Sequence, residues 1–295
     1  MHRQRQHPLH QGVELIQLLT RGAVGNHLLP GCGHDDDLPF RFVLEPCAGG
    51  NKAAIVTRMS ERFYINCPLA PGLIHLHGPE AHHLGTVCRL RPGDQVCLFN
   101  GDGHQYPARV INVTRKQVEL EVYKVEFADK ELPFKLEVAA PLPKGDRAQF
   151  LLEKLTELGV SHFVPLQTKR SVIHPGDNKL EKLERYVIEA SKQCGRNVLL
   201  RVEPLIAWEM YSKKKTLPEL RIMAHVHEAP ISHFAKSGIA IAVGPEGGFT
   251  DDEAEDAQRN GWQLVGLGPR MLRVETAALM MVAAAIFGVH KNPIL

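Results

Sequence analysis

The chain has 295 residues, of which 44% are hydrophobic and 23% charged, and its net charge is +2 from 35 basic and 33 acidic residues. This composition is that of an ordinary folded protein of one large or two smaller domains, and it excludes wholesale disorder, collagen-like repeats and a coiled-coil rod. Because the net charge is close to zero, a nucleic acid partner would have to be bound by local basic patches.

Residues 1–58 differ from the rest of the chain. They contain no serine and include scattered proline and glycine and the acidic run Asp35–Asp37. They have neither the apolar core of a secretory signal nor the serine-rich, acid-poor composition of a transit peptide. We expect an irregular, disordered extension and a natural start at Met59, and an accessory binding arm is the alternative.

Residues 59–130 are rich in short apolar runs bounded by turn sequences. A helix is predicted over 79–90, since proline is favoured at a helix start. Turn residues at 91–94 and 100–103 separate the remaining elements. Strands are predicted over 62–66, 73–76, 96–99, 106–111 and 118–122. Short strands joined by turns predict a small β-barrel.

Residues 131–295 alternate between strand and helix patterns. Strands are predicted over 135–140, 163–166, 199–205, 221–224, 239–243 and 264–266, and helices over 147–158, 179–193, from Thr250, and 276–289. Thr250 and Glu253 form a capping-box pattern. The run 239–243 is wholly apolar, as is typical of buried parallel strands. The fold class is therefore α/β, with a small barrel followed by a parallel sheet covered by helices on both faces.

The segment Gly244–Gly248 (GPEGG) lies between that apolar strand and the capped helix. Ligands of open α/β sheets bind at the carboxyl ends of strands, and glycines let backbone N–H groups approach them. The spacing matches neither dinucleotide nor P-loop fingerprints. The alternative is a tight loop that merely requires glycine.

A second loop, residues 267–276, also leads from a strand into a helix and carries Arg270, Arg273 and Glu275. Its charges could be those of a ligand site or of a solvated loop. The helix that follows is apolar on every side over 277–289, so it is either a core helix or one covered partly by a second subunit. It is shorter than the roughly 20 residues of a membrane-spanning helix, so no membrane association is expected.

The six cysteines show no CxxC spacing, and no metal site is predicted. Cysteines so sparse are typical of a reducing compartment, which favours a cytoplasmic protein.

Together these segments resemble the bacterial 16S ribosomal RNA uridine N3-methyltransferases of the knotted SPOUT superfamily. The resemblance covers roughly residues 60–291. Its motifs are GPEGG at 244–248, LGPRMLRVETA at 267–277, KGDR at 144–147, EKLTELGV at 153–160, QCGRN at 193–197 and RLRPGD at 89–94. The combination is specific, whereas GPEGG alone is only moderately so.

The resemblance implies a PUA-like RNA-binding barrel over 59–130 and a SPOUT methyltransferase domain over 131–295 with a C-terminal trefoil knot. The extension 1–58 has no counterpart in this family. The resemblance further implies S-adenosyl-L-methionine as cofactor, a homodimer, and 16S rRNA as substrate, within the assembled 30S subunit. The expected activity is methylation of N3 of a specific uridine.

The resemblance also implies site residues. The cofactor is expected at His225, Gly244, Pro245, Glu246, Gly247, Gly248, Leu267, Gly268, Met271, Leu272, Arg273, Thr276 and Ala277. Local positive charge, and not the resemblance, makes these residues candidate RNA contacts: Arg62, Arg89, Arg91, Lys144, Arg147, Lys169, Arg170 and Arg196.

Catalysis must remove or compensate the proton on uridine N3, and a fixed guanidinium suits stabilisation of the resulting anion. Arg196 and Arg273 are the candidates. Arg196 could instead contact phosphate or a helix C-terminus. Glu246 could hold the loops or act as a base, and Cys194 is expected to be structural.

Two other functions remain open. One is a SPOUT enzyme that modifies another RNA or atom, and the other is a non-catalytic RNA-binding factor with the same fold. The barrel argues against the first and the intact loops against the second. A nicotinamide or nucleotide enzyme is disfavoured because both phosphate fingerprints are missing.

We predict that a protein beginning at Met59 folds, binds S-adenosylmethionine and methylates 30S subunits at close to the full-length rate. A segment with so little continuous apolar pattern buries too little surface to offset the entropy of ordering it. Methylation kinetics and thermal denaturation of the two proteins provide the comparison. A large loss of either activity or stability would favour the accessory arm.

Overall fold

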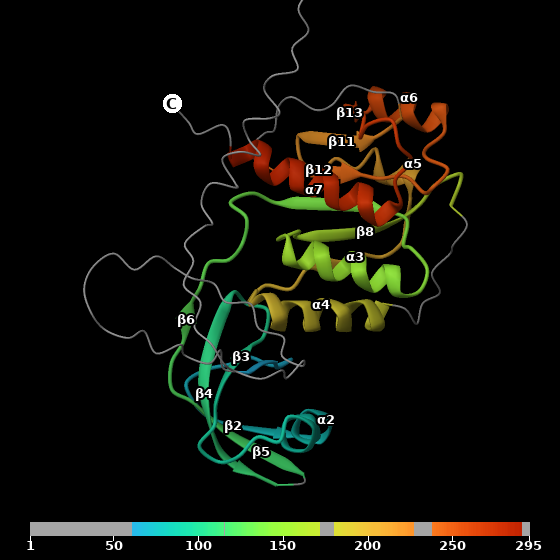
Figure 1. Ribbon diagram of the computed structural model, residues 1–295. Coiled ribbons are helices and arrows are strands. Elements are labelled where there is room, and N and C mark those ends of the chain that lie inside the picture. Colours follow the sequence, from blue (N-terminus) through green and yellow to red (C-terminus); the bar gives the residue numbers. More distant parts are fainter. Residues whose placement is uncertain (1–60, 115, 172–179, 227–237, 291–295) are drawn as a thin grey trace, which may run out of the picture. The chain divides into compact units, whose positions relative to one another are not determined.

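The computed structural model describes residues 61–114, 116–171, 180–226 and 238–290 (Figure 1). The extension predicted over 1–58 lies outside these residues. The domain boundaries predicted from sequence remain predictions.

The first described region contains six strands: β1 Glu61–Tyr64, β2 Gly72–His77, β3 Gln95–Phe99, β4 His104–Val113, β5 Gln117–Val122 and β6 Glu126–Phe127. They pair in the order β1-β3-β4-β5-β2, with β6 added to β4. The pairing of β1 with β3 is parallel. Alternate residues such as Val118 and Leu120 are fully buried, so the strands enclose their own core. The small β-domain expected before the α/β region is present.

The helix predicted over 79–90 is shorter than expected. The α-helical part, α2, is Gly78–His82, and the π-helical turn η1 follows at His83–Val87. Gly85 packs so closely against β4 that an added Cβ would lie 3.1 Å from Cγ1 of Val113. Arg89 has a φ of 54°, which no right-handed helix contains. Packing on the sheet therefore ended a helix that local propensity would have continued.

The second region contains the strands β7 Leu136–Ala140, β8 His162–Gln167, β9 Arg201–Val202, β10 Ile206–Ala207, β11 Leu220–Ala224, β12 Ile239–Ala242 and β13 Trp262–Val265. They form one sheet in the order β10-β8-β7-β12-β11-β13, with β9 also paired to β8. Every pairing in this sheet is parallel, as predicted. The strand predicted over 199–205 is shortened to β9, and β10 begins only after Leu205; Pro204, which has no N–H to donate, lies between the two strands.

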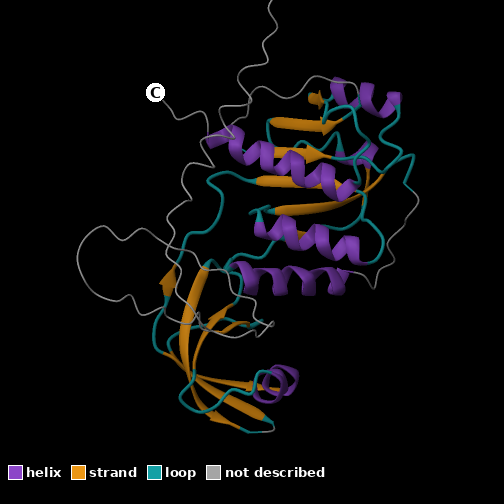
Figure 2. Cartoon of the chain, viewed as in Figure 1, coloured by secondary structure: helices purple, strands orange, loops and turns teal. Residues whose placement is uncertain are grey.

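The helices of this region are α3 Asp146–Glu157, α4 Leu180–Cys194, α5 Trp208–Tyr211, α6 Asp251–Arg259 and α7 Val274–His290. They cover both faces of the sheet (Figure 2). The short α5 was not predicted. The capping box of α6 is present, because Thr250 accepts from the Glu253 N–H and Glu253 accepts from the Thr250 N–H.

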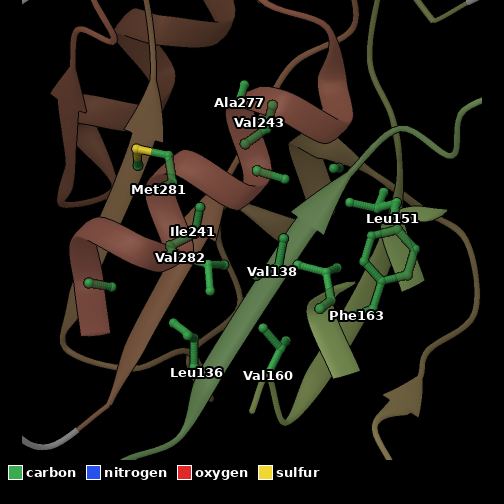
Figure 3. Packing of buried hydrophobic residues seen from close by; sticks show 14 of the residues in the cluster. Leu136, Val138, Leu151, Val160, Phe163, Ile241, Val243, Ala277, Met281 and Val282 are labelled. Atoms are coloured by element: carbon green, nitrogen blue, oxygen red, sulfur yellow. The ribbon is translucent and has the colours of Figure 1, made fainter. Parts of the chain in front are cut away.

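Alternate residues of the central strands supply two different cores. Val138 and Ile241 pack with α3 and α7 on one face (Figure 3). Ala139 and Ala240 lie on the opposite face, in the core that contains Trp208 and Trp262, whose ring centroids are 5.2 Å apart. Within the described residues the sheet is thus buried on both faces, which leaves the ends of its strands available to a ligand.

Helix α7 combines buried and exposed apolar side chains. Ala278, Val282 and Ala285 are fully buried against the sheet, whereas Met280 and Phe287 are 49% and 67% exposed. Within the described residues, no helix has both the length and the apolar character to cross a membrane. The predicted trefoil knot remains a prediction, since strand order alone does not define how the chain is threaded.

Candidate active site

Three loops meet where β11, β12 and β13 end. These strands are adjacent in the sheet, so their carboxyl ends lie at one edge. The loops following them enclose a cavity of about 170 Å³, lined by His225, by residues 243–249 and by residues on the loop before α7. His225 is fixed at the end of β11 by its N–H, which donates to the Val265 carbonyl over 2.9 Å.

The GPEGG loop is a tight turn fixed by a backbone hydrogen bond and by packing on the core. The Gly248 N–H donates to the Pro245 carbonyl over 2.8 Å, and Gly248 has a φ of 68°. A Cβ at Gly244 would lie 3.0 Å from the backbone nitrogen of Phe249. The Phe249 ring is buried 4.9 Å from the Trp208 ring, which ties the loop to the core. The turn therefore presents backbone groups to the cavity in a fixed conformation.

Residues that follow β8 support the same loop from the side. Arg170 donates from Nη1 to the Gly247 carbonyl over 2.6 Å. The Lys169 N–H donates to Oε1 of Glu253 over 2.9 Å, and its Nζ lies 2.9 Å from Oδ2 of Asp252. This hydrogen bond from Lys169 lowers the pKa of Asp252. Both basic residues, predicted as RNA contacts, thus make contacts within the protein.

All the residues predicted to bind the cofactor line this cavity, except Arg273 and Thr276. These two are exposed near the start of α7, beside lining residues on either side. Several further lining residues were not named individually for the cofactor: Arg170, Ala224, Val226, Val243, Phe249, Asp251 and Arg270. Arg270 lies inside the predicted loop 267–277, and Ala224, Val226, Val243 and Phe249 each adjoin a predicted cofactor residue, whereas Arg170 and Asp251 do not.

A second cavity, of about 280 Å³, adjoins the first. Both are lined by Arg170 and by residues 245–247. Its other walls come from residues 141–144, which follow β7, and from Arg147 and Val274. Residues 141–143 were missed by the sequence analysis. Only the strand order could have indicated these residues, because it places β7, which they follow, beside β12, which the GPEGG loop follows.

The second cavity is basic, with Lys144, Arg147 and Arg170 among its lining residues. Nη1 of Arg147 lies 3.3 Å from Oε1 of Glu246 and 3.9 Å from Oε1 of Glu275. The guanidinium therefore stands between the GPEGG loop and the first turn of α7.

Arg196 lies elsewhere. Its side chain is 3% exposed, and its guanidinium donates to both carboxylate oxygens of Glu131, over 3.0 and 2.5 Å. It also donates to the carbonyls of Thr156 and Val160 over 2.9 and 3.1 Å. It borders a different hollow, near the amino end of β8, whereas the cavity formed by the three loops lies at the carboxyl ends of the strands. This geometry is structural and gives no support to the catalytic or RNA-binding role predicted for Arg196.

We predict that Arg196→Met lowers the free energy of unfolding by about 3 kcal/mol, since it leaves two buried carbonyls and a carboxylate without their donor. Affinity for S-adenosylmethionine, measured by calorimetry below the unfolding temperature, should be unchanged. A stable variant that loses only methylation would restore the catalytic interpretation.

The remaining residues predicted to bind RNA divide into two groups. Arg89 and Arg91 are exposed in the β-domain. Arg62 is partly buried, where it donates to Oδ1 of Asn197 over 2.6 Å and lies over the Phe99 ring. Arg62 therefore connects the two regions of the chain, and its contact with RNA is not favoured by this position.

The family models agree with this division of the chain. Residues 130–286 match the RNA methyltransferase domain, and residues 76–123 match the RNA methyltransferase PUA domain. The ribosomal RNA small subunit methyltransferase E of Bacillus subtilis is 33% identical over 222 residues, which cover 70% of this chain and 87% of the relative. The enzyme of the same name from Rickettsia conorii is 32% identical, over 78% of this chain and 96% of the relative.

The chain belongs to this RNA methyltransferase family. The resemblance found in the sequence is thus confirmed, as is the order of a PUA-like domain followed by a methyltransferase domain.

Solved structures of family members place a cofactor in this fold. The small subunit methyltransferase E of Neisseria gonorrhoeae, bound to S-adenosyl methionine, is 32% identical, with a TM-score of 0.70 over 76% of this chain and 96% of that one. A methyltransferase from Legionella pneumophila, described as putative and in complex with the same cofactor, is 30% identical, with a TM-score of 0.69 over 77% and 96%.

Proposed function

We propose that the protein transfers a methyl group from S-adenosylmethionine to N3 of a uridine in 16S rRNA, within the 30S subunit. The observation that carries this proposal is the cavity formed by three neighbouring strand ends in a member of this family. The relatives named small subunit methyltransferase E and the two cofactor-bound structures support the substrate and the cofactor.

The residues present fit this cofactor. Leu267, Leu272 and Ala277 give the cavity an apolar wall, as an adenine ring requires. The glycines of the GPEGG loop leave backbone groups accessible, and Gly268 adopts a φ of 93° on the loop after β13. When bound, the cofactor supplies the methyl group on a positively charged sulfur. The protein holds the reactants in line and excludes water.

Arg273 is proposed to act at the rim of this site. It is exposed beside Leu272, which lines the cavity, and near Glu275. A charged side chain there can reach a substrate that enters from solvent. Thr276, exposed on the next turn, is proposed to complete the rim.

We further propose that the PUA-like region, residues 59–130, holds RNA through Arg89 and Arg91, and that residues 131–295 hold cofactor and target base. A second copy of the chain would cover the exposed apolar side chains of α7. The cytoplasm, where 30S subunits are assembled, is the proposed location.

The test uses 30S subunits from cells that lack this protein. Incubation with the pure protein and S-adenosylmethionine labelled in the methyl group should produce one N3-methyluridine in 16S rRNA, located by mass spectrometry of RNA fragments. A label on another RNA or atom would favour the alternative SPOUT activity. Binding of RNA and cofactor with no label at all would favour a non-catalytic factor.

A further inference from the structure

We propose that the second cavity receives the target uracil, and that Arg147 stabilises the negative charge formed on that base while Glu275 positions Arg147. This assignment rests on the proposed methylation of uridine N3. The catalytic role predicted for Arg196 is thereby assigned to Arg147, which lies beside the proposed cofactor cavity.

The position proposed for the uracil follows from the distance over which a methyl group can be transferred. A methyl donor and its acceptor atom must come within about 3–3.5 Å, so they must occupy adjoining spaces. The second cavity shares Pro245, Glu246 and Gly247 with the cofactor cavity. Its volume of about 280 Å³ is just below the usual range for ligand cavities, about 300–1,000 Å³, and suits a ligand as small as a single nucleotide base.

The walls of the second cavity also fit a base. Pro141, Leu142 and Val274 offer apolar contacts to the faces of a planar ring. Charged groups lie around them: Lys144 before α3, Arg147 in its first turn, Arg170 after β8 and Glu246 on the GPEGG loop. The Arg170 guanidinium already donates to the Gly247 carbonyl. The Arg147 guanidinium instead lies beside the carboxylates of Glu246 and Glu275.

Glu275 explains how Arg147 is held. Its side chain is 8% exposed, and Oε2 has no hydrogen-bond partner within the described part of the chain. A buried carboxylate is costly unless a cation compensates it. The amino end of α7 supplies part of this compensation, and Arg147, 3.9 Å away, supplies a full charge. Glu275 thus keeps the guanidinium at the cavity.

Glu246 has a different role from Glu275. It is 61% exposed, so its ion pair with Arg147 is a surface pair of small net stability. A uracil oxygen can replace it at little cost. The N–H groups of Arg147 would then donate to the base, at O2 or O4.

The chemical step requires the base, the methyl donor and water as the proton acceptor. The uracil N3–H bond breaks, the proton passes to water at the mouth of the cavity, and the electron pair stays on the base. That pair forms the new N3–CH₃ bond, while the pair of the breaking S–CH₃ bond goes to sulfur. A guanidinium beside O2 or O4 favours the anion and so promotes loss of the proton.

The test is single-turnover methylation of 30S subunits by the full chain, at saturating cofactor, from neutral to alkaline pH. Arg147→Met should slow methylation by about 100-fold at neutral pH. Its rate should rise with pH, so that the profile lies about 1–2 pH units more alkaline than that of the wild type. Added guanidinium ion should restore part of the neutral rate, and affinity for S-adenosylmethionine should be unchanged.

Lys144→Met is the matched control, since it removes a charge from the same cavity. It should weaken 30S binding and leave the pH profile in place. Arg147→Met/Glu275→Gln removes both members of the pair, so it tests the enzyme without an uncompensated carboxylate. Glu275→Gln alone should slow methylation, because Glu275 acts through Arg147. In the Arg147→Met background, Glu275→Gln should cause no further loss of rate.

Several outcomes would overturn the assignment. An unchanged pH profile in folded Arg147→Met, or equal shifts in Arg147→Met and Lys144→Met, would remove Arg147 from the chemistry. Additive rate losses would separate Glu275 from Arg147. If the wild-type protein forms no N3-methyluridine, the proposed function fails first, and this result is distinct from a defect confined to the variants.

Discussion

Gly247→Val should weaken the binding of S-adenosylmethionine at least tenfold, a change of about 1.4 kcal/mol. Gly247 lines both cavities, and its backbone faces the space where the cofactor is proposed to lie. An added Cβ would also stand 3.3 Å from Cδ of Arg170, which supports the loop. The branched side chain would therefore meet Arg170 on one side and the proposed cofactor on the other. Isothermal titration calorimetry measures the effect.

A control separates these two causes. Arg170→Ala removes the neighbouring side chain, so Gly247→Val/Arg170→Ala tests the loop without that contact. If valine blocks the cofactor itself, the double variant binds as weakly as Gly247→Val. Recovery of wild-type affinity in the double variant would show that the defect lay in the support by Arg170. Wild-type affinity in Gly247→Val itself would contradict the cofactor site.

Met280→Glu should convert a homodimer into monomers, with a dissociation constant at least about 100-fold higher, or about 2.8 kcal/mol. Met280 and Phe287 lie two turns apart on one exposed stripe of α7, whose opposite side packs on the sheet through Ala278, Val282 and Ala285. A glutamate there would be buried without a partner in the dimer, whereas it would be solvated in the monomer. Light scattering over a range of protein concentrations measures the effect.

The fold of the variant is checked by thermal denaturation, since a half-exposed side chain should contribute little to the monomer. Gln258→Glu on α6 adds the same charge at an exposed position and should leave the dimer intact. A wild-type protein that is monomeric at micromolar concentration would remove the dimer from the proposal. Dissociation by both substitutions would show that net charge, and not the α7 stripe, is responsible.

The site loops were predictable because their signals are local. An apolar strand, a glycine-rich turn and a capping box follow one another at 239–253, and each depends on residues a few positions apart. The same holds for the loop after β13. Parallel strands end at one edge, so the sequence by itself indicated that these loops would lie near each other. The order of a β-domain and an α/β domain was likewise visible in the change of periodicity near residue 134.

Only the tertiary structure decided which arginine stands where. Arg196 and Arg147 both lie in basic segments, and no local pattern distinguishes them. Arg196 is buried because Glu131 and two carbonyls, distant in sequence, meet it near the amino end of β8. Arg147 reaches the site because the sheet places β7 beside β12, which brings the start of α3 to the GPEGG loop and α7. Strand order depends on long-range packing, and periodicity carries no information about it; the second cavity, built from residues around 141, 170, 246 and 274, follows from that order alone.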